Sequence, residues 1–204
     1  ERFIQQQHLG ALDRKLREET QFELMNIQEE LKMTFLIVTH DQEEAMTVAD
    51  RIAVMDKGEL VQVATPAEIY EAPNSKFVAD FIGDINLIEA NVVEKSDAGT
   101  KLRSVADNFS IESDQVTDAA VGDRVWYAIR PEKVRIAQGR REKGVPNRID
   151  GVVWDIAYLG DMSIIHSKVG DDDGDTLRAT FANVSRMVEN PITWDDEVVM
   201  SFDR

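Results

Sequence analysis

The sequence predicts two parts of different fold class, an α/β first half over residues 1–84 and an all-β barrel over residues 85–204. The first half alternates apolar residues at helical spacing with short strand-like runs, a pattern typical of helices that cover a sheet. The second half has almost no helical period and consists of short strand-like segments separated by Gly and Asp turns. We place the boundary near Gly83-Asp84, where the period changes.

Composition excludes several classes of protein. The 204 residues carry 39 acidic against 23 basic side chains, a formal charge of -16, which argues against a protein that binds nucleic acid. Cys is absent, so disulfides, thiolate metal sites and Cys nucleophiles are excluded. No apolar run approaches the ~20 residues that span a bilayer, and the first residues lack the apolar core of a signal peptide. We therefore expect a cytoplasmic protein that reaches a membrane only through other proteins.

The first half yields specific expectations for its elements. Apolar spacing from Leu16 to Leu31 predicts a helix capped by Asp13, and the continuous run 34–39 predicts a strand buried on both faces of a parallel sheet. Asp41 with Glu44 predicts the start of another helix. A hairpin over 51–63 and two short helices, over 65–72 and 75–82, are expected to follow.

The second half is expected to form a small barrel. Short strands at this spacing favour a closed or partly closed barrel, because closure protects the strand edges. The polar stretch 138–147 predicts a loop or a hinge between two barrel lobes. The predicted strands cover residues 86–93, 124–130, 134–136, 151–158, 163–169, 176–181 and 197–202.

His40 is the leading candidate for chemistry, because it follows the predicted buried strand at the sheet edge where open α/β sheets bind ligands. Taken alone, a single His is more often tucked under a loop. Its context, Thr39-His40-Asp41-Gln42-Glu43-Glu44-Ala45, resembles the switch-histidine segment of ATP-binding-cassette importer ATPases. Upstream, Leu9-Gly10-Ala11-Leu12-Asp13 resembles the D-loop of that family, and segments 64–70 and 81–83 resemble its closing segment.

The second half extends this resemblance. Ile129-Arg130-Pro131-Glu132 resembles a motif of the transport-associated OB (TOBE) domain that is appended to such ATPases, and Ala157-Tyr158-Leu159-Gly160-Asp161 resembles the strand and turn that follow it. Residues 191–198 look most like the polyamine branch, which imports putrescine or spermidine. The resemblance implies the C-terminal portion of a P-loop NTPase-like nucleotide-binding domain, followed by an OB-like barrel.

The resemblance also implies cofactors and partners for the intact protein. ATP and Mg²⁺ would be bound, with His40 near the γ-phosphate and the attacking water, and with Gly10 and Asp13 facing the nucleotide across a homodimer. The partners would be membrane permease subunits, a second copy of the chain and, indirectly, a solute-binding protein. This places the intact protein on the inner face of the bacterial membrane.

Two requirements of ATP hydrolysis are missing from the sequence. Phosphoryl transfer needs a phosphate cradle, yet the chain has neither a G-x-x-x-x-G-K-[ST] loop nor the family's Ser-Gly-Gly-rich motif. Gln6 and Gln7 stand where the family has its Mg²⁺-associated Asp and its catalytic Glu, and a neutral amide does not accept a proton from water. The favoured interpretation of residues 5–8 is an ordinary polar leader, from a truncated or frameshifted reading frame. We expect a C-terminal portion that does not hydrolyse ATP alone.

Alternative and structural interpretations complete the expectations. The barrel could instead act as a non-catalytic regulatory, dimerisation or small-ligand-sensing module. No metal site is predicted, because the acidic run 171–175 lacks the spaced ligands of a calcium loop. His166 is expected to be structural, and the three Trp side chains are expected in the barrel core or between barrels. The first half should be less stable than the barrel, or should associate with another copy. The Trp residues concerned are Trp126, Trp154 and Trp194.

Overall fold

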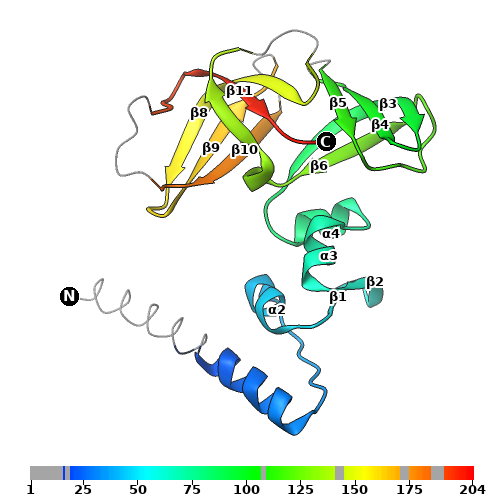
Figure 1. Ribbon diagram of the computed structural model, residues 1–204, viewed down its shortest axis with the longest axis vertical. Coiled ribbons are helices and arrows are strands. Elements are labelled where there is room, and N and C mark those ends of the chain that lie inside the picture. Colours follow the sequence, from blue (N-terminus) through cyan, green and yellow to red (C-terminus); the bar gives the residue numbers. More distant parts are fainter. Residues whose placement is uncertain (1–15, 17–18, 107–108, 141–144, 171–174, 185–190) are drawn as a thin grey trace. The chain divides into compact units, whose positions relative to one another are not determined.

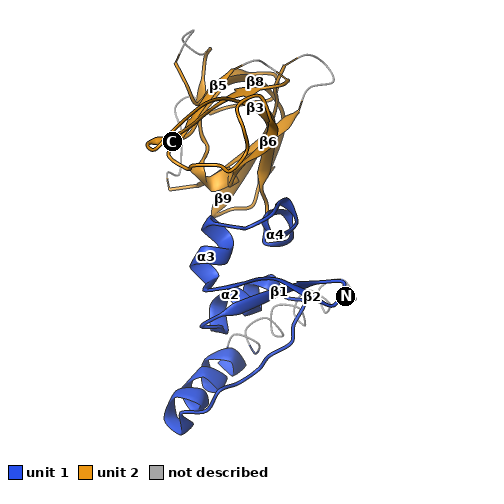
Figure 2. Ribbon diagram, turned by 90° about the vertical axis from the view of Figure 1, so that its right-hand side faces the viewer, with its two compact units in different colours: residues 1–83 blue, residues 84–204 orange. Residues whose placement is uncertain are grey.

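The computed structural model describes residues 16, 19–106, 109–140, 145–170, 175–184 and 191–204 (Figure 1). Its internal contacts divide the chain into two units, residues 1–83 and residues 84–204, which are coloured separately in Figure 2. Each unit is described by itself. Among the described helices, none is both long enough and apolar enough to cross a membrane.

Unit 1 contains short helices and one β-hairpin. A helix over residues 19–31 comes first. The later elements are α2 (Gln42–Val48), β1 (Ile52–Asp56), β2 (Glu59–Ala64), α3 (Pro66–Glu71) and α4 (Lys76–Phe81). The hairpin, the two short helices and the start of α2 agree with the sequence-based expectations.

Local side-chain chemistry explains where these elements begin and turn. Lys57 and Gly58 have φ values of 49° and 87°, the left-handed pair that a two-residue hairpin turn requires. The Asp41 side chain accepts a hydrogen bond from the backbone N of Glu44 at the start of α2. Thr65 and Glu68 form a reciprocal capping box at the start of α3. These groups satisfy backbone donors that the first helical turn leaves unpaired.

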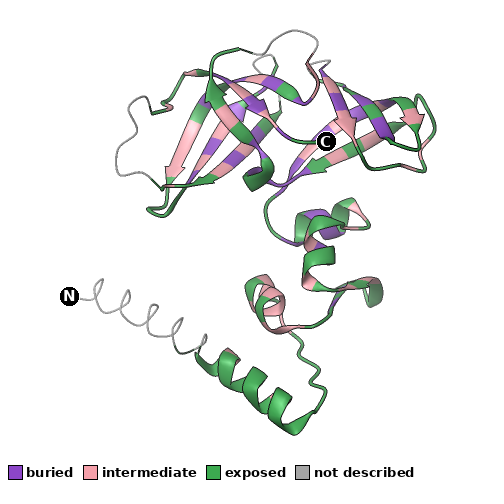
Figure 3. Ribbon diagram, in the orientation of Figure 1, coloured by how far each residue is buried: buried purple, intermediate pink, exposed green. Residues whose placement is uncertain are grey.

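The buried core of unit 1 is small. It joins the hairpin to α3 and α4 through five buried side chains, which are Ile52, Val54, Ile69, Val78 and Ile82. Figure 3 shows how little of this unit is fully buried in comparison with the strands of unit 2. Unit 1 therefore has few buried apolar contacts to stabilise it.

The predicted buried strand at residues 34–39 is not formed, and that expectation is wrong. Residues 33–39 have no regular secondary structure, and the side chains of Leu36 and Val38 are each 93% exposed. A parallel strand exists only through hydrogen bonds to neighbouring strands. In the described part of unit 1, the only ladder is the one between β1 and β2, so this segment has no partner to pair with.

Unit 2 consists almost entirely of antiparallel strands. Four of them form one sheet in the order β5-β4-β3-β6, and five form a second sheet in the order β10-β9-β8-β11-β7. The all-β OB-like expectation is thereby confirmed, although β4 and β5 had no counterpart among the predicted strands. The strands are β3 (Asn86–Ser96), β4 (Gly99–Ser104), β5 (Ser110–Ser113), β6 (Arg124–Ile129), β7 (Arg135–Gln138), β8 (Arg148–Tyr158), β9 (Met162–Lys168), β10 (Thr176–Ala182) and β11 (Glu197–Ser201), with a 3₁₀ turn η1 (Pro131–Lys133) before β7.

The two sheets of unit 2 repeat one motif. In each sheet the order is third, second, first and fourth strand, so β3–β6 correspond to β8–β11. Both first strands carry a bulge at the same place, between Val92 and Glu94 in β3 and between Val153 and Asp155 in β8. Val92 N donates to Asp123 O at 2.9 Å, and Val153 N donates to Asp196 O at 3.0 Å. Repeated bulges and repeated hydrogen bonds identify an internal duplication.

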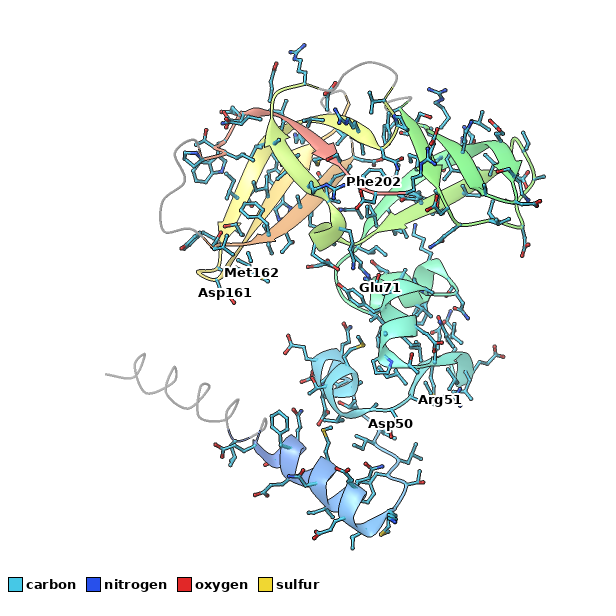
Figure 4. All side chains as sticks on the ribbon, viewed as in Figure 1. Asp50, Arg51, Glu71, Asp161, Met162 and Phe202 are labelled. Carbon is cyan, nitrogen blue, oxygen red and sulfur yellow. The ribbon has the colours of Figure 1, made fainter. Side chains whose placement is uncertain are left out.

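One core spans both lobes of unit 2, where one lobe is the sheet β5-β4-β3-β6 and the other is the sheet β10-β9-β8-β11-β7. Buried residues from both sheets, such as Ile88, Ile111, Ile149 and Met200, belong to the same cluster. Phe202, labelled in Figure 4, stacks on Tyr127 from the other lobe with ring centroids 5.5 Å apart. Burial raises the pKa of Tyr127 to about 12, so its hydroxyl stays neutral at physiological pH.

The Trp side chains are not in this core, which corrects the sequence-based expectation. Trp126, Trp154 and Trp194 are 49%, 48% and 60% exposed. Trp154 follows the buried Val153 in β8, so the alternation of the strand turns its ring outward. There it meets His166 of β9 edge-on, with ring centroids 5.8 Å apart. His166 therefore packs beside an exposed indole on the outer face of the sheet.

Candidate functional site

The segment of residues 39–45, which resembles the switch-histidine segment, lies at the start of α2 in unit 1. His40 is exposed and directly precedes the capping residue Asp41. Thr39 Oγ1 accepts a hydrogen bond from Asp41 N at 3.0 Å, and Asp41 Oδ1 accepts one from Glu44 N at 3.1 Å. These two bonds fix the turn that presents the His40 imidazole, although the preceding residues are not held in a sheet. The imidazole can donate or accept a hydrogen bond, as contact with a phosphate or a water requires.

An apolar hollow of about 410 Å³ lies beside this segment. Helix 19–31, residues 34–39, α2 and the start of β1 line it, and Asp50 and Arg51 (labelled in Figure 4) are the charged residues at its β1 end. Its walls are mainly side chains such as Leu24, Phe35 and Val48. A phosphate cradle consists of backbone N–H groups and a Lys, so this hollow does not fit a nucleotide phosphate.

Gln42 connects the same segment to the last residue of unit 1. Its Oε1 accepts a hydrogen bond from the backbone N of Gly83 at 2.9 Å, across 41 residues of sequence. Gly83 has a φ of 76°, a conformation that Gly adopts at little cost at the end of a helix. The sequence offers no signal for this contact, because the two residues lie 41 positions apart.

Two arginines hold the first residues of unit 2. Arg130, only 4% exposed, donates from Nη1 to the carbonyl O of Asp84 at 3.0 Å. Arg178 donates from Nη1 to the Asp84 carboxylate at 2.6 Å and from Nη2 to the carbonyl O of Ile85 at 3.0 Å. The Arg in the Ile129-Arg130-Pro131-Glu132 motif therefore anchors the point at which the chain enters the barrel.

Two asparagines at equivalent places link the lobes of unit 2. Asn86 pairs with the backbone of Arg178 in β10, accepting from its N at 2.8 Å and donating to its O at 2.7 Å. Asn147 pairs in the same way with the backbone of Glu112 in β5, at 2.8 and 2.9 Å. The signal that could have revealed them is the repeated pattern Asn-x-Ile-acid-small, which begins at each Asn.

The other sequence-predicted site residues fall on the N-terminal part of the chain that the structure does not describe. Gly10, Asp13 and the Gln6-Gln7 pair lie outside the described residues, so the D-loop prediction stays a prediction. No cluster of three or more His, Asp or Glu side chains that could hold a metal ion occurs within the described ranges. Among the predicted site residues, His40 is thus the one whose local geometry the structure describes.

Comparisons with known proteins find similarity to polyamine transport ATP-binding proteins. Residues 127–204 match the TOBE domain family. The putrescine transport ATP-binding protein PotG of Escherichia coli (strain K12) is 40% identical over 197 residues, which cover 96% of this chain and 51% of the relative. The spermidine/putrescine import ATP-binding protein PotA of Thermotoga maritima is 39% identical over 197 residues, which cover 95% and 52%. The chain spans about half the length of these curated relatives.

A solved structure shows a weaker likeness. The cytoplasmic molybdate-binding protein ModG aligns with 57% of this chain and 89% of its own, at a TM-score of 0.45 and 12% identity. Likeness at this level carries no information on a ligand.

Proposed function

Because residues 127–204 belong to the TOBE domain family and nearly the whole chain is related to polyamine-import ATP-binding proteins, we propose that it is the C-terminal part of such a subunit. Unit 1 then contributes the distal portion of an ATP-binding-cassette nucleotide-binding domain, and unit 2 is the appended TOBE barrel. The observation that carries this proposal is the 40% identity over 197 residues to a putrescine transport ATP-binding protein.

In the intact subunit, ATP and Mg²⁺ would be held by the cradle that this sequence lacks, so no catalytic step is assigned to this chain alone. His40 would face the terminal phosphate, and Gly10 and Asp13 would face the nucleotide of a second copy. Membrane permease subunits would receive the closing motion of the dimer, and a solute-binding protein would deliver the polyamine. The unformed strand at residues 34–39 agrees with a nucleotide-binding domain whose other strands lie elsewhere in the subunit.

A chimera tests the proposal. The portion of E. coli PotG that this chain does not match would be joined to the chain, with Gln6→Asp and Gln7→Glu restoring the two carboxylates. We expect Mg²⁺-dependent ATP hydrolysis and putrescine uptake in cells that lack PotG. His40→Ala should abolish both, while the control His166→Ala should retain them. A folded chimera without nucleotide binding, or one indifferent to His40→Ala, would contradict the proposal.

A regulatory or dimerisation role of the barrel is the second candidate. It is supported by the continuous core of unit 2, which joins both lobes without any residue of unit 1. The 204-residue chain would be heated with ATP and, separately, with putrescine or spermidine. A polyamine-dependent rise in the unfolding temperature of unit 2, without an effect of ATP, favours a sensor.

A further inference from the structure

The peptide that joins the two units is held by side chains on both sides. On the unit 1 side, Gln42 Oε1 accepts from Gly83 N at 2.9 Å. On the unit 2 side, Arg130 and Arg178 bind the carbonyl and the carboxylate of Asp84. Side chains therefore hold both residues of the Gly83-Asp84 peptide, and this is true whatever the placement of the units.

The hold on the unit 2 side is firm. Arg130 is buried, and a buried guanidinium that loses an acceptor leaves donors without a partner, which costs more than a surface hydrogen bond contributes. Arg178 adds bonds to Asp84 and Ile85, and Asn86 pairs with the backbone of β10. A displacement of Asp84 would therefore strain the contacts of Arg130, which precedes η1, and of Arg178 in β10.

On the unit 1 side, the contact to Gly83 comes from the segment that contains His40. Gln42 is the first residue of α2 and lies two residues after His40. Thr39, Asp41 and Glu44 are linked by short-range hydrogen bonds around it, so the turn moves as one piece. A shift of His40 thereby shifts the amide oxygen that holds Gly83.

We infer that Gln42 is a positioning residue that couples the His40 segment to the barrel entrance through Gly83 and Asp84. The significance of the His40 movement rests on the proposed function, since nucleotide contact would supply it. The coupling itself is a property of this chain and requires no nucleotide. A purely local role, in which Gln42 only ends α4, predicts effects confined to residues 76–82.

Amide exchange in the full 204-residue chain, labelled with ¹⁵N, tests the contact. Gln42→Met removes the acceptor at nearly constant size, whereas Gln42→Glu keeps an acceptor oxygen. We expect the Gly83 amide to exchange about tenfold faster in Gln42→Met and close to the wild-type rate in Gln42→Glu. Glu43→Gln, on the exposed side of α2, is the matched control and should leave Gly83 unchanged.

A double-mutant comparison tests the coupling. His40→Ala should shift the amide resonances of Asp84 and Ile85 in the wild-type and Gln42→Glu backgrounds, and should leave them unshifted in Gln42→Met. The inference is overturned if Gln42→Met leaves Gly83 exchange unchanged. It is also overturned if the shifts from His40→Ala stop at residue 82, or reach Asp84 equally in Gln42→Met. Failure of the chimera to bind ATP would sink the proposed function and leave this result intact.

Discussion

Replacing Asn147 probes the link between the two lobes of unit 2. Its side chain is 6% exposed and forms three hydrogen bonds, to the N and O of Glu112 and, at 3.3 Å, to the O of Asp203. At about 1 kcal/mol net for each bond, loss of all three costs about 3 kcal/mol of unfolding free energy. Asn147 also has a φ of 55°, where a residue with Cβ is about 1 kcal/mol less favourable than Gly. Native Asn147 already carries this backbone cost, so we expect Asn147→Ala to cost about 3 kcal/mol for the lost hydrogen bonds, and Asn147→Gly about 2 kcal/mol because Gly relieves the backbone strain.

Asn86 provides the matched control, because it forms the equivalent pair of bonds without a left-handed backbone. There the order should reverse, with Gly less stable than Ala by about 0.5–1 kcal/mol, since Gly in a strand loses more backbone entropy. Urea unfolding followed by Trp fluorescence measures unit 2 alone, because all three Trp residues lie between residues 84 and 204. The reasoning is refuted if Asn147→Ala costs less than about 1 kcal/mol, or if Asn147→Gly is the less stable of the two.

Two further substitutions test single features of the structure. Gly99→Ala should destabilise unit 2 by more than about 2 kcal/mol in the same urea assay, because the new Cβ would lie 2.1 Å from Ser113 O. Gly58→Ala should cost only about 1 kcal/mol of unit 1 stability, measured by far-UV circular dichroism, because its Cβ would meet open space and only the φ of 87° is unfavourable. Hydrogen bonding and charge from Arg135 hold the pKa of Asp203 below its ordinary value of 3.8, so this carboxylate's stabilising contribution is complete above that pH and is lost as the pH falls through the lowered pKa. The acid side of the stability curve should therefore be flatter for Asp203→Asn than for the wild type, and identical curves would exclude this ion pair as a contributor.

Features fixed by neighbouring residues could be predicted from the sequence. The caps at Asp41 and Thr65 and the Lys57-Gly58 turn depend on residues three or fewer positions apart, and the structure shows each of them. The family resemblance rested on short motifs in the right order, and the comparisons confirm it. For the caps and the turn, the interacting residues are close neighbours in the sequence, so the sequence alone is enough to predict them.

Features fixed by distant residues could not be predicted. Strands β4 and β5 are short and carry one large apolar side chain each, Leu102 and Ile111, so they become strands only by pairing within the four-stranded sheet. The Asn86 and Arg178 contacts join residues 92 apart, so the residues around Asn86 in the sequence do not identify its partner. The strand predicted for residues 34–39 was wrong for the opposite reason. These residues have a strand-like composition, but a strand forms only when neighbouring strands are there to pair with it.

The two units should differ in stability. Unit 1 exposes large apolar side chains, including Leu36 and Val38, and its described ladder has two strands, whereas Ala90 and Val153 in unit 2 are fully buried in larger sheets. Opening free energies follow local burial and hydrogen bonding, so amides in residues 33–56 should exchange far faster than those in β3 and β8. Mass-detected hydrogen exchange at several concentrations would measure this. Protection of residues 33–39 that rises with concentration would mean that a second copy covers the exposed surface, as an apolar face of this kind favours. Strong and equal protection of both units in a monomer would contradict the reasoning, because the contacts that unit 1 makes do not provide it.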